Sequence, residues 1–334
     1  MNKKLITLAI AAAMVAPLAA AAETTLYGRL DTALVSGDDD TERAWDIDTG
    51  TTRIGVKGSE DLGNGMKAIF QAEWEFGSSE GGSTSDNGDG TALDNRLAYG
   101  GLSGGFGTIA IGRQWTPYYG AVDKTDIFNN PGGSNSASAG NIASANANSI
   151  GPSRTGNALA YVSPNFSGFV AKLALVIDRA TGLGESDGVD AYNPSLQYDN
   201  GPISIGVSAL EYDKDVEAAG IQDVWGVAGS YDFGMFKLIA QYEDMDDYEG
   251  SSDTGKDEWS LAAEANFGNN TIRALYGNVD YDNGDDMDVW AVGLQHNFSA
   301  RTRVYAEYAA NNLDKDSVTD LDKDQFSLGL RHDF

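Results

Sequence analysis

Few residues of this chain could do bond chemistry, and most of its reactive groups are carboxylates and guanidinium groups. The sequence has no cysteine and only two histidines, His296 and His332. A hydrolytic dyad or triad needs a histidine beside a nucleophile. Both histidines instead share the sequence parity of apolar neighbours such as Leu294 and Leu330. Without cysteine, disulfides, thiolate catalysis and thiolate metal sites are excluded. We therefore expect neither an enzyme nor a bound cofactor.

The remaining candidate chemistry is electrostatic, because the chain is strongly acidic. It has 22 basic and 50 acidic residues and a formal net charge of −28. Such a charge repels the phosphate backbone, so partners made of nucleic acid are excluded. What the charges do depends on the elements that hold them.

The first 22 residues read MNKKLITLAIAAAMVAPLAAAA. Two lysines, a short apolar stretch and an Ala-Ala-Ala end are the pattern of a cleaved secretory signal peptide. The alternative is an N-terminal membrane anchor, but the apolar stretch is short for a span of about 20 residues. No domain boundary follows, so residues 23–334 are expected to form a single domain.

The mature chain consists of segments of about ten residues that alternate in polarity. From Met66 to Phe76 every second residue is apolar, while the residues between them include Lys67, Gln71 and Glu73. Residues 236–243 and 259–267 repeat this pattern. Successive side chains of a strand point to opposite faces, so each segment predicts a strand with one apolar and one polar face.

Short turns and long polar loops alternate between these segments. Seven short turns carry Gly, Asn or Pro, and eight longer loops lie at about 37–49, 78–92, 115–153, 179–190, 213–221, 245–256, 281–287 and 312–322. This spacing predicts about sixteen strands, each antiparallel to its neighbours.

The apolar faces must all meet a suitable solvent. A soluble sandwich would bury them against a second sheet. Here aromatic residues recur near strand ends, Tyr27, Trp74, Tyr99 and Trp290 among them, which is typical of a membrane–water interface. Short turns on one side and long loops on the other indicate an outer-membrane barrel. The predicted fold class is all-β, a 16-stranded antiparallel transmembrane β-barrel whose lumen holds water.

The order of several motifs resembles the Gram-negative general porins, the trimeric 16-stranded family, over the whole mature chain. TLYGRLDTAL (25–34) is similar to the first strand of that family, TRIGVKGSEDLGNGMKAIFQAEWEF (52–76) to the second and third, NRLAYGGLSGGFGTIAIGRQ (95–114) to the fourth and fifth, and YVSPNFSGF (161–169) to the sixth-to-seventh turn. The resemblance implies a channel of the bacterial outer membrane for passive diffusion of small hydrophilic solutes and ions. It also implies a homotrimer joined through the early strands and the 78–92 loop.

In the resembling family the third long loop folds into the lumen and narrows it, and residues 115–153 hold that place. The family's tip, Pro-Glu-Phe-Gly-Gly, reads Asn-Asn-Pro-Gly-Gly at 129–133, without its acid. Asp123 and Asp126 are therefore expected to carry the acidic side of the constriction. Three aromatic residues could pack this part of the loop on the wall: Tyr118, Tyr119 and Phe128. Residues 134–150 are either part of the constriction or a mobile surface tract.

The basic side is expected on the opposite wall, at Arg29, Arg53, Arg96 and Arg154. The first three have lumen parity and match wall arginines of the family, and the fourth follows the third loop. Guanidinium groups stay charged beside one another. Facing carboxylates across water, they would create a field transverse to the pore. The alternative is that each arginine is a structural partner of a wall carboxylate such as Asp31 or Glu73.

The C-terminal stretch QFSLGLRHDF carries an apolar stripe to its last residue, through Phe326, Leu328, Leu330 and Phe334. A closed barrel pairs its last strand with its first, because an open edge would leave unsatisfied backbone groups in lipid. The stripe resembles the signal that the barrel-assembly machinery recognises after periplasmic chaperones deliver a porin. Phe334 could also serve as an interface aromatic, and the two roles are compatible.

The outer loops are acidic, as in GDDDTE (37–42), SDNGDG (85–90), EDMDDYEG (243–250) and DNGDDMD (282–288), and none has EF-hand spacing. One interpretation is solvated loops that repel one another. The other is weak Ca²⁺ or Mg²⁺ bridging to lipopolysaccharide phosphates. In both cases the mouth should enrich cations and give mild cation selectivity, although salt screens this within about 8–10 Å.

Two other functions fit parts of the sequence. A substrate-specific sugar channel would line its lumen with aromatic residues, whereas most aromatics here have lipid parity. A non-conducting structural or adhesive barrel would share the acidic loops. The general pore accounts for more of the pattern.

Overall fold

The computed structural model describes residues 23–38, 43–79, 93–129, 152–177, 188–214, 222–247, 252–314 and 321–334. The signal-peptide prediction, the loop 80–92, the tip 130–133 and the tract 134–150 lie outside these residues. No helix in the described ranges is long and apolar enough to cross a membrane.

Strands make up most of the described chain. The first half contains β1 (Glu23–Asp38), β2 (Arg43–Thr49), β3 (Arg53–Gly63), β4 (Met66–Glu75), β5 (Asp94–Gly104), β6 (Gly107–Trp115), β7 (Arg154–Val162) and β8 (Phe169–Val176). The second half contains β9 (Ala191–Asn200), β10 (Ile203–Tyr212), β11 (Val224–Asp232), β12 (Phe236–Met245), β13 (Lys256–Phe267), β14 (Asn270–Tyr281), β15 (Asp286–Asn297), β16 (Thr302–Asp314) and β17 (Leu321–Asp333). One short helix, α2 (Pro117–Val122), follows β6.

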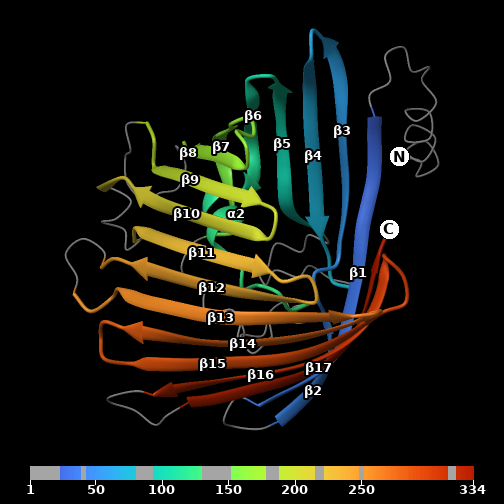
Figure 1. The fold of residues 1–334 in the computed structure, drawn as a ribbon, viewed down its shortest axis with the longest axis vertical. Helices are drawn as coiled ribbons and strands as arrows, with labels where there is room; N and C mark the ends of the chain where they lie inside the picture. The colour runs from blue at the N-terminus through green and yellow to red at the C-terminus, as the bar shows by residue number, and fades with distance from the viewer. Residues whose placement is uncertain are drawn as a thin grey trace, which may run out of the picture.

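Neighbouring strands pair in antiparallel order around a closed barrel, and β1 pairs with β17 to close it. The two ends of the barrel sequence therefore lie side by side (Figure 1). The barrel has sixteen strands because β2 and β3 share one position. Thr32 of β1 lies opposite Thr49 of β2, and Arg29 of β1 lies opposite Arg53 of β3. The predicted fold class is confirmed.

The break between β2 and β3 lies against Asp31. Gly50 donates its backbone N–H to the carbonyl oxygen of Asp31 at 3.0 Å. A Cβ at residue 50 would stand 2.8 Å from the Asp31 carboxyl carbon, so the chain can pass this side chain only at glycine. The prediction of a loop over 37–49 was wrong in its second half, because Arg43–Thr49 continues the barrel strand.

The two faces of the strands separate as the period-two pattern predicts. On β1, Leu26 and Leu30 are exposed on the outer face, whereas Asp31 is completely buried on the inner side. On β17 the outer face carries the predicted C-terminal stripe, with Leu328, Leu330 and Phe334 exposed. The stripe is therefore placed as expected, and its recognition role stays a prediction.

Two aromatic residues face the lumen instead of lipid, which corrects their assignment to the membrane interface. Tyr27 donates its hydroxyl to Glu73 at 2.9 Å, and Tyr99 donates to Gln71 at 2.8 Å. Gln71 in turn donates to the Tyr27 oxygen at 2.6 Å, so the polar inner wall satisfies both hydroxyls.

A change in register on β5 was not predicted. The pairing of β4 with β5 shifts between Glu73 and Trp74, which leaves Arg96 as an extra residue of β5. The bulge turns Arg96 inward beside Leu97, which is 1% exposed.

Candidate functional site

The third loop begins with the helix α2, which has a well-formed start. The Thr116 side chain accepts the Tyr119 N–H at 3.1 Å, and Pro117 occupies the first helical position. Both are favoured at helix N-termini. Thr116 also donates its backbone N–H to the Ser153 carbonyl at 3.0 Å, which holds the two ends of the loop together.

Helix α2 packs on the inner wall of the barrel. Tyr118, Ala121 and Val122 are buried in one cluster with four wall residues of β9, β10 and β11: Ala191, Leu210, Val224 and Ala228. The helix approaches β10 very closely, because a Cβ at Gly206 would stand 2.1 Å from the Ala121 carbonyl oxygen. Tyr118 fixes the orientation by donating its hydroxyl to Glu243 at 2.7 Å.

The chain after α2 continues along the wall as far as β16. Thr125 bonds to Gln241 of β12, and Phe128 packs in an apolar cluster with wall residues such as Val289 and Ala291. Asn129 donates its backbone N–H to Glu307 at 3.0 Å and its side-chain amide to the same oxygen at 2.8 Å. Residues 116–129 therefore lie inside the barrel, as expected for a constriction loop (Figure 1).

The two predicted acidic residues lie on this segment. Asp123 caps α2, and its backbone N–H bonds to the Tyr119 carbonyl at 3.2 Å. Asp126 is exposed, and its carboxylate accepts the Tyr119 hydroxyl at 3.4 Å. Burial raises the pKa of the Tyr119 hydroxyl, and the charges of Asp126 and Asp123 raise it further. The hydroxyl therefore stays a hydrogen-bond donor at neutral pH.

Three of the predicted arginines, Arg29, Arg53 and Arg96, lie on the inner wall and are paired there with carboxylates. Glu73 is shared, because Arg96 donates to it at 2.8 Å and the Arg53 guanidinium lies 3.6 Å from it. Arg96 also bonds to Glu75. Arg29, from the first strand, donates to Asp333 at 2.7 Å. These contacts fit the interpretation of the three arginines as structural partners, and their role in lining the constriction stays a prediction.

Arg154 differs from the other three. Its guanidinium carbon lies 4.9 Å from the centre of the Trp115 ring, a cation–π distance. Its Nε is buried and has no hydrogen-bond partner among the described residues. The Trp115 ring stacks on Tyr119 with 4.7 Å between ring centres, and Tyr119 reaches Asp126. The stacked rings of Trp115 and Tyr119 therefore lie between Arg154 of the wall and Asp126 of the third loop.

Sequence reasoning missed Trp115 and the role of Glu75. Trp115 ends a strand, and nothing in its spacing says that its ring meets Tyr119 and Arg154. Glu75 follows Glu73 on the same parity, so strand alternation could have paired both with arginines on neighbouring strands.

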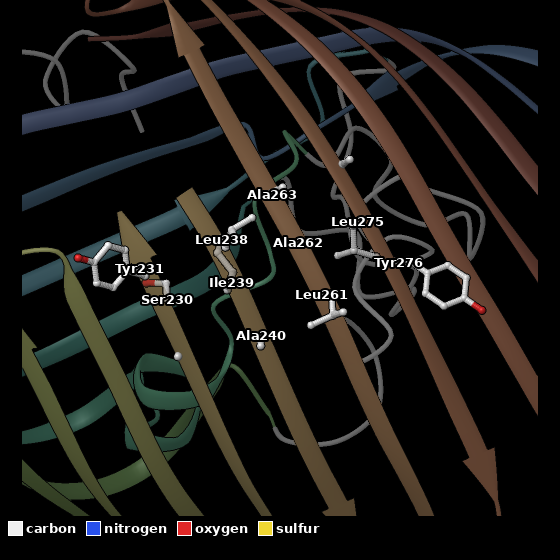
Figure 2. Close-up of a pocket in the computed structure, with 12 residues that line it drawn as sticks. Ser230, Tyr231, Leu238, Ile239, Ala240, Leu261, Ala262, Ala263, Leu275 and Tyr276 are labelled. Carbon is white, nitrogen blue, oxygen red and sulfur yellow. The ribbon is translucent and has the colours of Figure 1, made fainter. Parts of the chain in front are cut away.

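Another hollow in the described chain lies away from this site. It has a volume of about 680 Å³ and is lined by residues of β11 to β14. Figure 2 shows Tyr231 and Tyr276 on either side of it, with Leu238 and Leu261 between them. All four side chains are exposed on the outer face, so this hollow faces lipid and is not part of the lumen site.

No group of three or more His, Asp or Glu side chains in the described ranges is arranged to hold a metal ion. Much of the acidic outer loops, including residues 39–42, 80–92 and 248–251, lies outside those ranges.

Comparison with known proteins agrees with this geometry. The sequence matches the Gram-negative porin family over residues 8–316. The chain belongs to this family. It is 30% identical to outer membrane porin protein 32 of Delftia acidovorans over 321 residues, covering 92% of this chain and 89% of the relative. It is 31% identical to the major outer membrane protein P.IB of Neisseria meningitidis over 324 residues, covering 90% and 91%.

Solved structures of porins have the same fold. The anion-selective porin from Comamonas acidovorans superposes with a TM-score of 0.76 at 24% identity, covering 94% of this chain and all of that one. The trimer form of OmpT from Vibrio cholerae gives a TM-score of 0.66 at 18% identity, again covering 94% and 100%.

This porin is thus a non-enzymatic channel protein of the bacterial outer membrane. The side-chain contacts of the two histidines are consistent with a channel protein. His296 pairs with Asn270 at 2.9 Å and His332 with Thr302 at 2.8 Å, and neither bond joins a histidine to a carboxylate.

Proposed function

We propose that this porin is a general diffusion pore for small hydrophilic solutes and ions, with mild cation selectivity. Its constriction would lie between Asp123 and Asp126 of the third loop and the arginine wall. The observation that carries the selectivity is the pairing of that wall: Arg29, Arg53 and Arg96 each lie against a carboxylate.

Arg53 and Arg96 are matched by Glu73 and Glu75, so this part of the wall contributes little net field at the distance of a passing ion. Asp333, in contrast, is shared by Arg29, Arg303 and Arg331. Arg154 differs from both groups, since no ion pair within 4 Å is recorded for it in the described chain. Lys172 and Lys237 of the inner wall also have no recorded ion pair in the described chain, and all these charges belong to a protein whose formal net charge is −28. The balance favours cations in the lumen and at its mouths.

The main rival is anion selectivity. The porin from Comamonas acidovorans, whose structure is similar to this chain, is anion-selective. At 24% identity the similarity supports the fold and leaves the charges of the constriction to be judged from this chain. The pairing of Glu73 and Glu75 with the wall arginines supports cation selectivity for this chain.

Planar-bilayer recording tests the proposal. Purified protein in a KCl gradient should give stable openings with a reversal potential of the sign set by K⁺. Arg154→Gln should strengthen cation preference, and Asp126→Asn should weaken it. A reversal potential of the Cl⁻ sign in the unmodified protein would contradict cation selectivity, and folded protein without conductance would contradict the pore.

We also propose a homotrimer that contacts its neighbours through the early strands. Support comes from the trimer form of a structurally similar porin and from the exposed apolar outer face of β1 to β6, including Leu30, Phe70 and Ile111. The chain should migrate as a trimer in mild detergent and as a monomer after heating. A folded species with the mass of one chain would contradict this assembly.

The maturation steps are part of the same proposal. Cleavage after residue 22 should be detected by N-terminal sequencing of the outer-membrane protein. The stripe Phe326, Leu328, Leu330 and Phe334 would then engage the assembly machinery, and deleting Phe334 should leave unfolded chain in the periplasm. Lipopolysaccharide would surround the extracellular half of the barrel.

A further inference from the structure

A small pocket opens on the inner wall beside the start of α2. Its volume is about 230 Å³, and it lies between α2 and the wall formed by β4 to β8. Its apolar part includes side chains of Ile69, Tyr99, Ala110, Trp115 and Ala160. It is smaller than the pockets of about 300–1,000 Å³ that hold drug-sized ligands. It therefore suits a small molecule.

One side of the pocket is cationic. Lys172 of β8 lines it together with Gly120 of α2. A Cβ at residue 120 would stand 3.2 Å from the Lys172 ammonium, so the glycine leaves room above that charge. No ion pair within 4 Å is recorded for Lys172 in the described ranges. The charge of Lys124 repels the Lys172 ammonium, and the charge of Asp199 attracts it more weakly. The local charge is positive, which favours an anion.

Two buried polar groups beside Lys172 lack partners. The same Cβ position at residue 120 lies 3.5 Å from Nε2 of Gln197, so this amide and the Lys172 ammonium converge below Gly120. Gln197 is 9% exposed, and its Nε2 has no hydrogen-bond partner in the described chain. Ser195, which lies opposite Lys172 in the register, is 7% exposed and has an unpartnered hydroxyl. Buried donors without acceptors are costly, so such a group indicates a missing acceptor.

We propose that this pocket binds a small monocarboxylate with a compact apolar or aromatic body. The carboxylate would accept hydrogen bonds from Lys172 and Gln197, a charge-assisted arrangement. The body would lie against Ile69, Tyr99 and the exposed part of Trp115. The pocket would hold such anions beside the constriction during passage, so the inference rests on the proposed diffusion pore.

Benzoate is a suitable probe, and two relatives separate its charge from its ring. Acetate has the same charge without the body, and benzamide has the body without the charge. Benzoate should interrupt the single-channel current in a concentration-dependent way, at concentrations at least tenfold below those at which acetate or benzamide does so. Equal effects of benzoate and acetate would overturn the proposal, since they would indicate a general field.

Lys172→Gln is the decisive variant, and Lys237→Gln is its matched control. Lys237 is also on the inner wall but lines a different hollow, with Asp199, Ser204 and Asp232. The benzoate effect should weaken at least tenfold in Lys172→Gln and stay within twofold in Lys237→Gln. An equal loss in both variants would overturn the assignment to this pocket.

A third variant tests the role of the Gln197 amide, whose Nε2 lacks a hydrogen-bond partner in the described chain. Gln197→Glu would place a carboxylate of the protein next to Lys172, so it should exclude benzoate while conductance in KCl persists. Unchanged benzoate affinity in Gln197→Glu would contradict the proposed geometry. Calorimetric titration of benzoate into the detergent-solubilised protein measures binding without conductance. It therefore separates failure of this site from failure of the pore.

Discussion

The aromatic ring of Phe334 lies directly over Gly28, where the last strand meets the first. The two residues exchange both backbone hydrogen bonds, at 3.1 and 3.0 Å. A Cβ at residue 28 would stand 2.3 Å from Cζ of Phe334 and 2.7 Å from the Arg53 carbonyl oxygen. Gly28 therefore lets the ring and the strand edge come together at the seam of the barrel.

We predict that Gly28→Ala impairs closure of the barrel. The added methyl group must displace the Phe334 ring or the backbone of Arg53, and overpacking of this kind costs about 1–3 kcal/mol. The measurement is the fraction of refolded protein that migrates as heat-modifiable barrel, followed across a urea series.

Gly37→Ala on the same strand is the matched control, because a Cβ there meets its nearest atom at 3.8 Å, an ordinary contact. Equal refolding of both variants would show that the seam does not depend on the contact between Gly28 and Phe334.

We next predict that Glu73→Gln moves ion selectivity toward anions. Glu73 is 4% exposed and compensates both Arg53 and Arg96, so its loss leaves positive charge on the lumen wall. Breaking a buried pair also lowers stability by about 3–5 kcal/mol. The reversal potential in a KCl gradient should shift in the Cl⁻ direction. Glu60→Gln, the same charge change at an exposed position of β3, should leave it nearly unchanged.

Most of the barrel could be predicted from period-two alternation and turn residues, because a strand between water and lipid must separate its two faces. The alternation failed where the backbone departs from the ideal pairing. The bulge turned Arg96 inward beside Leu97, and it has no residue pattern of its own. The strand β2 was missed because it follows the acidic run 37–42, although Trp45 and Ile47 alternate there with Asp46 and Asp48.

The candidate site was predictable in its charges but less so in its contacts. Alternation placed Arg29 and Arg53 on the inner wall. It also allowed Glu73 as a partner of Arg53, because β3 and β4 are consecutive strands. It could not show that Asp333 pairs with Arg29, because that contact depends on how β17 closes on β1. The meeting of Trp115, Tyr119 and Arg154 depends on the path of the third loop, which packing against distant strands decides.

Attachment of the third loop to β16 yields a further prediction. Asn129 donates two hydrogen bonds to one oxygen of Glu307, and both residues are buried. Asn129→Asp would remove the side-chain donor and place a second carboxylate there, at a cost of about 1–3 kcal/mol. The loop should detach more often, which would appear as noisier and larger open-channel currents.

The double variant Asn129→Asp with Glu307→Gln offers a rescue, because it restores one donor opposite one acceptor. Quiet currents should return in the double variant. If Asn129→Asp alone stays as quiet as the unmodified channel, the bond to Glu307 does not hold the loop.

Asp247, in the loop between β12 and β13, is predicted to control local order with pH. Its carboxylate accepts the backbone N–H groups of Thr254 at 2.6 Å and Gly255 at 2.8 Å. These bonds hold the pKa of Asp247 below its ordinary value. A group with a lowered folded-state pKa stabilises its contact above its ordinary pKa of about 4 and loses that contribution as pH falls through the lowered value.

The Thr254 amide proton should therefore shift in NMR spectra as the pH is lowered below about 4. Asp247→Asn should remove this titration, whereas Asp253→Asn, a neighbouring change of the same charge, should leave it in place. A Thr254 resonance that titrates equally in both variants would assign the effect to another carboxylate.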